Sequence, residues 1–263
     1  MLIIGERINV ITKLQREAMQ KRDKAPIQEM ARNQVKSGAG MLDINIGPAE
    51  DDGPALMDWI VKTVQEAVQV PLCLDTTNPA AMEAGLKAHD NTWGRPMINS
   101  ASGEEERLNV MMPLAGKYGA QIIGLTLNKQ GIPALAEDRC AIAAEIMAKA
   151  AEDGVPMEDI YLDPLILPVP FSQDKSLESI RAIKLFRELN DPPMKTVVGL
   201  SNISNGAPKY LRPILNRVFT ALLMYEGLDS AIIDPLELEM IQVIKTTDIL
   251  MGKTLYAHSY LEM

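Results

Sequence analysis

The feature that most constrains the fold of this chain is a short apolar run that ends in a carboxylate or a carboxamide and recurs along the sequence. In residues 71–78, a mostly apolar stretch leads into Asp75, and Pro79 then opens a segment with helical spacing. A continuous apolar run that is ended by a turn signal is typical of a buried parallel strand. The same design recurs in four further runs, at residues 41–47, 96–100, 160–166 and 196–202.

Strand-like and helix-like segments alternate along the whole chain, at roughly thirty residues for each pair, which is near the length of one unit of a (β/α)8 barrel. We therefore predict an α/β protein with one domain, a (β/α)8 TIM barrel that spans residues 1–263. An open doubly wound sheet is the main competing fold, but it uses fewer strands, and residues 5–9 lack its glycine-rich first turn. The predicted strands are residues 2–9, 41–47, 71–76, 97–100, 121–127, 160–166, 196–201 and 230–233. The predicted helices are residues 25–37, 55–68, 79–89, 102–118, 137–153, 175–189 and 210–225, and a last helix that ends near residue 250.

Two of the predicted helices begin with a capping signal. Asn78 followed by Pro79 matches an N-cap residue with proline at the first helical position. Ser102 and Glu105 have the spacing of a capping box, in which the two side chains bond to each other's backbone N–H groups. We therefore expect helices to begin directly after Asn78 and after Ser102.

Composition and charge limit the kinds of partner. The chain has 26 Lys and Arg against 35 Asp and Glu, a formal net charge of −9, which argues against nucleic acid and anionic membranes as main partners. No apolar run has the length of a membrane span, and the first residues lack the basic start of a signal peptide. The two cysteines, Cys73 and Cys140, have no metal-site spacing and suit inert thiols in a reducing compartment. We therefore expect a cytoplasmic protein.

The active site of a (β/α)8 barrel lies at the carboxyl ends of its strands. An ionised Asp there accepts two N–H bonds from an aminopyrimidinone edge, and an Asn side chain meets a carbonyl and an N–H together. Such groups suit a flat, nitrogen-rich ring such as a pterin or a purine. The polar residues predicted at these ends are Glu6, Asn9, Asp43, Asn45, Asp75, Asn99, Asp163, Ser201, Asn202 and Asn205.

Three other uses of these residues remain open. The carboxylates can bind a divalent metal, although such sites usually serve a phosphate or an enolate, and no Lys or His base stands at a strand end. A glycosidase with paired carboxylates normally has aromatic platforms for the sugar, and only 4% of this chain is aromatic. Asp75 and Asp163 can also simply cap the turns that follow them.

Six motifs, in order along the chain, resemble the methyltetrahydrofolate:corrinoid protein methyltransferases, which are similar to the folate domain of cobalamin-dependent methionine synthase. The resemblance covers essentially the whole chain and implies a pterin-binding TIM barrel. Dihydropteroate synthase has the same barrel, but this chain lacks its typical first loop. The motifs are Leu2-Ile-Ile-Gly-Glu-Arg-Ile-Asn9, Leu42-Asp-Ile-Asn-Ile-Gly-Pro48, Leu74-Asp-Thr-Thr-Asn78, Met97-Ile-Asn-Ser100, Asp163-Pro-Leu-Ile-Leu-Pro168 and Gly199-Leu-Ser-Asn202.

The resemblance assigns roles to the residues of these motifs. It implies that Asp75, Asn99 and Asp163 hold the edge of the pterin, with support from Asp43. It also implies that Asn202 approaches N5, the nitrogen that carries the methyl group. Gly199, Ser201 and Asn205 complete the predicted pterin site, although Asn205 stands where the family often has Gln. Asn202 and Asp75 are the residues that we expect to act in catalysis.

The resemblance also implies the partners. The activity expected is methyl transfer between methyltetrahydrofolate and the cobalt of a corrinoid (cobalamin) that a separate protein carries, in acetogenic metabolism or in demethylation of phenyl methyl ethers, methylamines or betaine. No metal of its own is expected, and a homodimer is implied. Alternatives are a non-catalytic folate-binding protein, an enzyme like dihydropteroate synthase, and a metal-dependent barrel enzyme.

Overall fold

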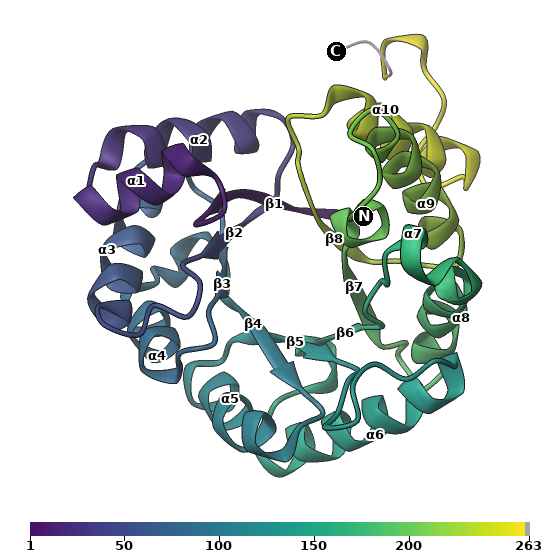
Figure 1. Ribbon diagram of the computed structural model, residues 1–263, viewed down its shortest axis with the longest axis horizontal. Helices are drawn as coiled ribbons and strands as arrows, with labels where there is room; N and C mark the ends of the chain where they lie inside the picture. Colours follow the sequence, from purple (N-terminus) through teal and green to yellow (C-terminus); the bar gives the residue numbers. More distant parts are fainter. Residues whose placement is uncertain (261–263) are drawn as a thin grey trace.

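The computed structural model describes residues 1–260, in which eight parallel strands close into a barrel in the order in which they occur along the chain. Figure 1 looks down this barrel, with the helices as a ring around it. The predicted (β/α)8 architecture is therefore confirmed. The strands are β1 (Leu2–Asn9), β2 (Met41–Asn45), β3 (Leu72–Asp75), β4 (Met97–Ser102), β5 (Gln121–Leu125), β6 (Ile160–Asp163), β7 (Lys195–Gly199) and β8 (Ser230–Ile233).

The helices agree with the predicted ones to within a few residues, and two were not predicted. α1 was missed because its sequence is mostly charged and polar, and α7 because it is a single turn. The helices are α1 (Lys13–Lys21), α2 (Lys24–Lys36), α3 (Gly53–Gln65), α4 (Pro79–Ala88), α5 (Glu105–Tyr118), α6 (Ala136–Glu152), α7 (Val169–Ser172), α8 (Ser176–Arg187), α9 (Arg212–Tyr225) and α10 (Leu238–Leu250). Five short 3₁₀ turns are η1 (Asn91–Trp93), η2 (Met157–Asp159), η3 (Gln173–Lys175), η4 (Leu200–Ser204) and η5 (His258–Tyr260).

Two separate sets of buried side chains hold the barrel together. The larger set fills the space between the strands and the surrounding helices, and burying each Leu, Ile or Met there contributes roughly 1.5–3 kcal/mol. The smaller set lies inside the barrel and closes its lower end. Its members are Ile4, Met41, Cys73, Met97, Ile123, Tyr161 and Val197.

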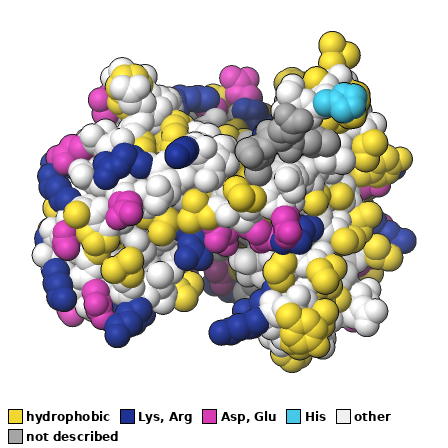
Figure 2. Space-filling view, turned by 90° about the horizontal axis from the view of Figure 1, so that it is seen from above, with side chains coloured by type: hydrophobic (Ala, Val, Ile, Leu, Met, Phe, Trp, Pro, Cys, Tyr) yellow, Lys and Arg dark blue, Asp and Glu magenta, His cyan; other side chains and the backbone are white. Residues whose placement is uncertain are grey.

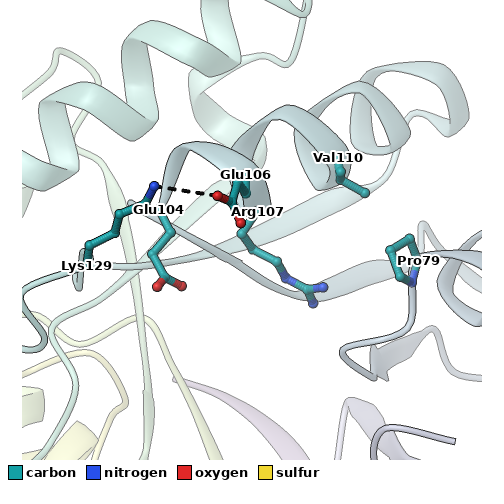
Figure 3. Close-up of a pocket in the computed structure, with 6 residues that line it drawn as sticks. All are labelled: Pro79, Glu104, Glu106, Arg107, Val110 and Lys129. Atoms are coloured by element: carbon teal, nitrogen blue, oxygen red, sulfur yellow. Dashed lines mark ion pairs between the residues drawn. The ribbon is translucent and has the colours of Figure 1, made fainter. Parts of the chain in front are cut away.

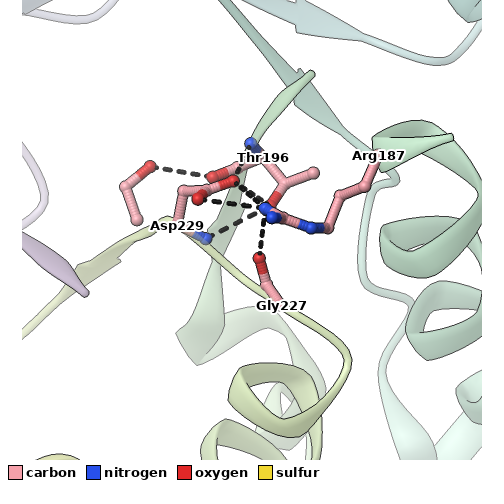
Figure 4. A network of polar contacts seen from close by, with 5 residues as sticks. Arg187, Thr196, Gly227 and Asp229 are labelled. Atoms are coloured by element: carbon pink, nitrogen blue, oxygen red, sulfur yellow. Dashed lines mark hydrogen bonds and ion pairs between the residues drawn. The ribbon is translucent and has the colours of Figure 1, made fainter. Parts of the chain in front are cut away.

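A polar network fastens β7 to β8 at the amino ends of the two strands (Figure 4). Asp229 accepts hydrogen bonds from the backbone N–H of Thr196 at 2.9 Å and from its hydroxyl at 3.1 Å. Arg187, from the end of α8, binds the same carboxylate at 3.0 Å and the carbonyl oxygen of Gly227 at 3.0 Å. These contacts pair a half-exposed carboxylate with a cation and fix the strand ends that lie farthest from the site.

One capping prediction is confirmed and the other is wrong. The Asn78 side chain accepts from the N–H groups of Ala80 and Ala81 at 3.0 and 3.2 Å. Ser102, in contrast, is the last residue of β4, whose register shifts between Ile98 and Ala101. This irregularity lengthens the strand, so that the Ser102 hydroxyl donates to the Glu104 carboxylate at 3.0 Å and caps no helix.

The isolated Cys and His residues have structural surroundings. Cys73 is buried and Cys140 is partly buried. His89 is buried, and its Nε2 accepts the backbone N–H of Leu72 at 3.2 Å at the start of β3. None of the helices described in residues 1–260 is long and apolar enough to cross a membrane.

Candidate active site

The site is one layer of side chains above the apolar set that closes the barrel. Side chains in a strand alternate between its two faces, so residues two apart point the same way. Two residues after the apolar side chains Met41, Cys73 and Tyr161 stand Asp43, Asp75 and Asp163. In these three strands, the alternation therefore turns the last inward position into a polar group above an apolar floor.

These positions open into a cavity of about 300 Å³ at the carboxyl ends of the strands. Asn205 is exposed and does not line it. Prediction from sequence missed four apolar side chains of the lining, Ile11, Leu125, Leu165 and Ile232, because apolar residues at strand ends are not distinctive. Of the predicted residues, the cavity brings together Glu6, Asn9, Asp43, Asn45, Asp75, Asn99, Asp163, Gly199, Ser201 and Asn202.

Two pairs of an acid and an amide form across neighbouring strands. Asn99 donates from Nδ2 to the Asp43 carboxylate at 3.1 Å. Asn45 donates from Nδ2 to the Asp75 carboxylate, and its Oδ1 accepts the N–H of Gly47 at 3.0 Å. Because the carboxylates accept the Nδ2 groups, the orientation of both amides is set. Each carboxylate has four acceptor positions, so both keep capacity for N–H donors of a ligand.

Asp163 is held by the loop that follows β6. Its Oδ1 accepts the N–H of Leu165 at 2.7 Å. Leu165 has a φ of 62°, a left-handed conformation that leucine rarely adopts. The carbonyl oxygen of Leu165 accepts the Ser179 hydroxyl at 3.4 Å, and that hydroxyl in turn accepts from the fully buried guanidinium of Arg139 at 3.1 Å. The loop conformation is thus held from α6 and α8, behind the cavity wall.

Burial raises the pKa values of the cavity acids. The pKa of Asp43 is raised well above its ordinary range, mainly by burial and secondly by the nearby Asp75 carboxylate. Burial raises the pKa of Asp75 to about 6, although the Asn45 amide and the Arg107 charge act in the other direction. Burial likewise raises the pKa of Asp163 to about 7. Bound N–H donors would favour the ionised forms, so the cavity is suited to a ligand that is rich in such donors.

Arg107 is a site-edge residue that the sequence did not single out. It donates to the carbonyl oxygens of Ser100, Thr77 and Thr76 at 2.8–2.9 Å and so ties the end of β3 to the end of β4. It also lines a second pocket of about 280 Å³ outside the barrel mouth (Figure 3). There Glu106 and Lys129 pair at 3.5 Å, so charges of both signs are present and no single ligand class is indicated.

Within residues 1–260, no group of three or more His, Cys, Asp or Glu side chains is placed to hold a metal ion. Two of the cavity acids, Asp43 and Asp75, are each hydrogen-bonded to an amide side chain.

Comparison with protein families gives a match over most of the chain. A family model described as pterin binding enzyme matches residues 5–234. The chain belongs to the pterin-binding enzyme family. The cavity of this pterin-binding enzyme lies within the matched region, as do all of the predicted site residues.

Two curated relatives of this pterin-binding enzyme are similar in sequence. It is 30% identical to the methylcorrinoid:tetrahydrofolate methyltransferase of Eubacterium limosum over 263 residues, which are 99% of this chain and 94% of that protein. It is 33% identical to the methionine synthase of Mycobacterium tuberculosis over 242 residues, which are 88% of this chain. The match spans only 20% of the synthase.

Solved structures of two dihydropteroate synthases share the fold. The Yersinia pestis enzyme with a pterine-sulfa conjugate superposes with a TM-score of 0.72 at 16% identity, over 95% of this chain and 94% of that one. The Thermus thermophilus enzyme in complex with 6HMPPP gives a TM-score of 0.65 at 19% identity, over 97% and 94%. At these identities the likeness concerns the fold alone.

Proposed function

We propose that this protein is a methyltransferase that moves a methyl group between N5 of methyltetrahydrofolate and the cobalt of a corrinoid carried by a separate protein. The observation that carries the proposal is the cavity of about 300 Å³, whose polar lining consists of acids, amides and a hydroxyl above an apolar floor. The relative from Eubacterium limosum, which is matched over nearly its full length, is named for this kind of reaction, with the methylcorrinoid as donor.

The proposed roles follow from hydrogen-bonding capacity. A pterin carries an amino group and ring N–H groups, which the carboxylates of Asp75 and Asp163 accept. Asn99, oriented by Asp43, offers its carbonyl oxygen to a further ring N–H. Gly199 lets the backbone approach the ring closely. Ser201 and Asn202 come from the turn after β7, on the side that we assign to N5.

The proposed chemistry depends on stabilising N5 as its bonding changes. The corrinoid supplies the cobalt that exchanges the methyl group. The amide N–H of Asn202 stabilises N5 by a hydrogen bond that is stronger at the transition state than in the bound substrate, which is what lowers a barrier. The acids along the pterin edge keep the ring in one orientation, so that the methyl group points toward the mouth.

The remaining expectations form part of the same proposal. Residues 1–263 act as one domain, which is supported by strands that run from Leu2 to Ile233 in one barrel. A corrinoid protein docks over the mouth, the protein needs no metal of its own, and it works in the cytoplasm. Neither nucleic acid nor membrane is a partner, as the net charge of −9 suggests.

We also propose a homodimer that forms through α9. Four apolar side chains on one face of this helix, Ile214, Val218, Leu222 and Tyr225, are 46–74% exposed. Two of them, Ile214 and Val218, also line an apolar groove of about 210 Å³ between α9, the η4 turn and the starts of α7 and α8. Figure 2 shows exposed hydrophobic side chains gathered on the side of the molecule that carries α9 and α10. A second copy of the same stripe covers such a face symmetrically.

The first experiment is titration with methyltetrahydrofolate, followed by anaerobic addition of cob(I)alamin and detection of methylcobalamin by its absorption spectrum. We expect binding and methyl transfer. Binding without transfer would favour a non-catalytic folate-binding protein. Failure to bind would contradict the assignment of the cavity to a pterin.

Two variants test the assigned roles. Asp75→Ala removes an acceptor for ring N–H groups and should weaken methyltetrahydrofolate binding at least ~10-fold. Asp58→Ala is the matched control, because the Asp58 side chain on α3 is 44% exposed and forms its ion pair with Lys62, outside the cavity. Asn202→Ala should leave binding nearly unchanged and slow transfer ~100-fold. Equal transfer rates in Asn202→Ala and the parent protein would refute the N5 role.

A further inference from the structure

Under the proposed function, on which the following inference rests, methyl transfer at N5 moves a proton as well as a methyl group. Tetrahydrofolate carries a hydrogen on N5, and methyltetrahydrofolate carries the methyl group in its place. Each transfer onto N5 therefore releases one proton, and each transfer from N5 takes one up. The amide of Asn202 does not exchange a proton near neutral pH, so a different group has to do so.

Glu6 differs from the other acids of the cavity in its partners. Asp43, Asp75 and Asp163 each accept an N–H from an amide side chain or from the backbone. Among residues 1–260, the Glu6 carboxyl group accepts one hydrogen bond, from the Ser201 hydroxyl at 3.4 Å, through one of its two oxygens. Ser201 is the neighbour of Asn202 in the chain, and both line the cavity with Glu6. Glu6 thus lies on the N5 side with the weakest hydrogen bonding among the four acids.

Glu6 also lines a second, smaller chamber beside the main cavity. This chamber measures about 30 Å³ and lies between β1, the η4 turn, α9 and the start of α10. A water molecule needs roughly 10–15 Å³ of such volume and two to four polar partners. The lining supplies them, with Glu6, Ser201, Asp234, Glu237 and Asn216. The Oδ1 atom of Asn216 is buried and has no hydrogen-bond partner among the described residues.

We propose that Glu6 is the acid–base group that exchanges the N5 proton, and that water in the side chamber returns this proton to the solvent. Asp234 and Glu237 are partly exposed, which connects the chamber to the outside. The chamber lies beside the cavity, where residues after β7 and β8 meet the start of α10. Glu6 is reached from both spaces, because it lines the cavity and the chamber.

The step balances in each direction. In transfer onto tetrahydrofolate, the lone pair of N5 forms the new N–C bond, the Co–C bond breaks with its electron pair left on cobalt, and the N5 proton goes to the Glu6 carboxylate. In transfer from methyltetrahydrofolate, two electrons of the reduced cobalt form the Co–C bond. The N–C bond then breaks with its pair left on N5, which takes the proton from the Glu6 carboxyl group.

The charges around Glu6 suit this exchange near neutral pH. The pKa of Glu6 is raised to about 7, mainly by burial and secondly by the carboxylate of Asp234, which lies in the turn after β8. The Ser201 hydroxyl and Arg7 act to lower this pKa. Asp43, on β2, repels Glu6 across the cavity. Glu237, at the start of α10, lines the chamber and is paired with Arg217 of α9. These are the charged groups that face Glu6 from the elements around it.

The test measures methyl transfer in both directions between pH 5.5 and 8.5 at saturating folate, with methylcobalamin and tetrahydrofolate in one assay and cob(I)alamin and methyltetrahydrofolate in the other. In the parent protein, the rate of transfer onto tetrahydrofolate should rise as pH increases through about 7, because the Glu6 carboxylate accepts the proton. The rate of transfer from methyltetrahydrofolate should fall over the same range, because the protonated Glu6 donates it. Glu6→Gln should bind methyltetrahydrofolate within ~3-fold of the parent, lose both pH dependences, and slow transfer by ~100-fold.

Two further variants separate acid–base function from a structural role. Glu6→Asp keeps the acid and should restore part of the rate and the pH dependence. Asp234→Asn removes the charge that raises the pKa of Glu6 and should move the midpoint of both profiles to lower pH. Unchanged profiles in Glu6→Gln would overturn the role of Glu6 and leave the methyltransferase proposal standing. Absence of transfer in the parent protein itself would overturn both.

Discussion

At the level of a single residue, Asp163 shows that a buried acid suited to a ligand can also destabilise the fold that holds it. The residue is 6% exposed, and the favourable charge of Arg139 acts on it less strongly than burial does. A carboxylate in such a place is unfavourable until a ligand supplies N–H donors. The buried acids of the cavity therefore destabilise the ligand-free protein at neutral pH.

This conflict predicts an unusual dependence of stability on pH. Because the pKa of Asp163 is raised from 3.8 to about 7 in the folded protein, the folded state keeps a proton that the unfolded chain has lost between these values. The free energy of unfolding should therefore fall as pH rises from 4 to 7, by on the order of 4 kcal/mol from this group. Asp163→Asn should flatten the fall and be more stable than the parent protein at pH 8.

Urea unfolding of both proteins at pH 5, 6, 7 and 8 checks this expectation. Asp43, Asp75 and Glu6 act in the same direction, so the variant should keep part of the slope. Parallel curves for the two proteins would show that Asp163 ionises normally in the fold.

Residue identities at the strand ends were predictable, and their surroundings were not. Asp43, Asp75, Asn99 and Asp163 follow apolar strand residues, so their convergence follows from the barrel alone. Asn205 was predicted to lie at the end of the seventh strand, but the η4 turn ends before it and leaves it exposed. The supporting role of Arg139 could not be predicted from sequence, because its contact to Ser179 joins residues 40 positions apart.

At the scale of elements, the loop between β6 and α7 depends on the helices behind it. Ser179 on α8 links the buried Arg139 of α6 to the carbonyl oxygen of Leu165. Ser179→Ala breaks this link and leaves the guanidinium with one hydrogen bond fewer. We expect a loss of ~1–2 kcal/mol in the free energy of unfolding and weaker methyltetrahydrofolate binding, since the N–H of Leu165 then no longer fixes Asp163.

Ser176→Ala is the matched control for this prediction. Ser176 is on the same helix, and its hydroxyl is buried without a hydrogen-bond partner among the described residues. We expect this variant to keep the stability and the folate affinity of the parent protein in calorimetry. Equal behaviour of the two alanine variants would refute the link from Ser179 to Asp163.

The start of α4 gives a prediction that separates two contacts of one side chain. Asn78 caps α4 through Oδ1 and donates from Nδ2 to the carbonyl oxygen of Ala49 at 3.0 Å. Asn78→Asp keeps the cap and loses the second contact, whereas Asn78→Ala loses both. Thermal unfolding should show destabilisation by ~1 kcal/mol in the first case and ~2 kcal/mol in the second. If the Ala49 contact were unimportant, Asn78→Asp would be at least as stable as the parent protein, and only Asn78→Ala would be destabilised.

Element boundaries show where sequence patterns stop being informative. The strand at residues 71–76 and the helix after Asn78 were predictable, since an apolar run and a cap define them. The irregularity in β4 was not, because it depends on pairing with β5 and leaves no composition signal. It moved Ser102 from the predicted helix into the strand.

At the scale of the molecule, the apolar stripe on α9 predicts the assembly state. Val218 is in the middle of the stripe and is 58% exposed, so Val218→Glu should leave the fold intact and place a charge at the centre of the proposed interface. Sedimentation equilibrium should give a dimer for the parent protein and a monomer for Val218→Glu. Leu255→Glu, 92% exposed beyond α10, is the control and should remain dimeric. A monomeric parent protein would refute the homodimer.

The apolar side chains that close the lower end of the barrel also govern the order of events. Seven buried residues, from Ile4 to Val197, close the bottom of the barrel, so the exit of the cavity for a folate is at the mouth. If a corrinoid protein docks over that exit, folate enters before it and leaves after it. Steady-state kinetics should then be those of a compulsory-order mechanism, with folate as the first reactant to bind and the last product to dissociate. The apolar residues at the bottom of the barrel, which contact no reacting atom, would thus set the order in which the two partners bind and leave.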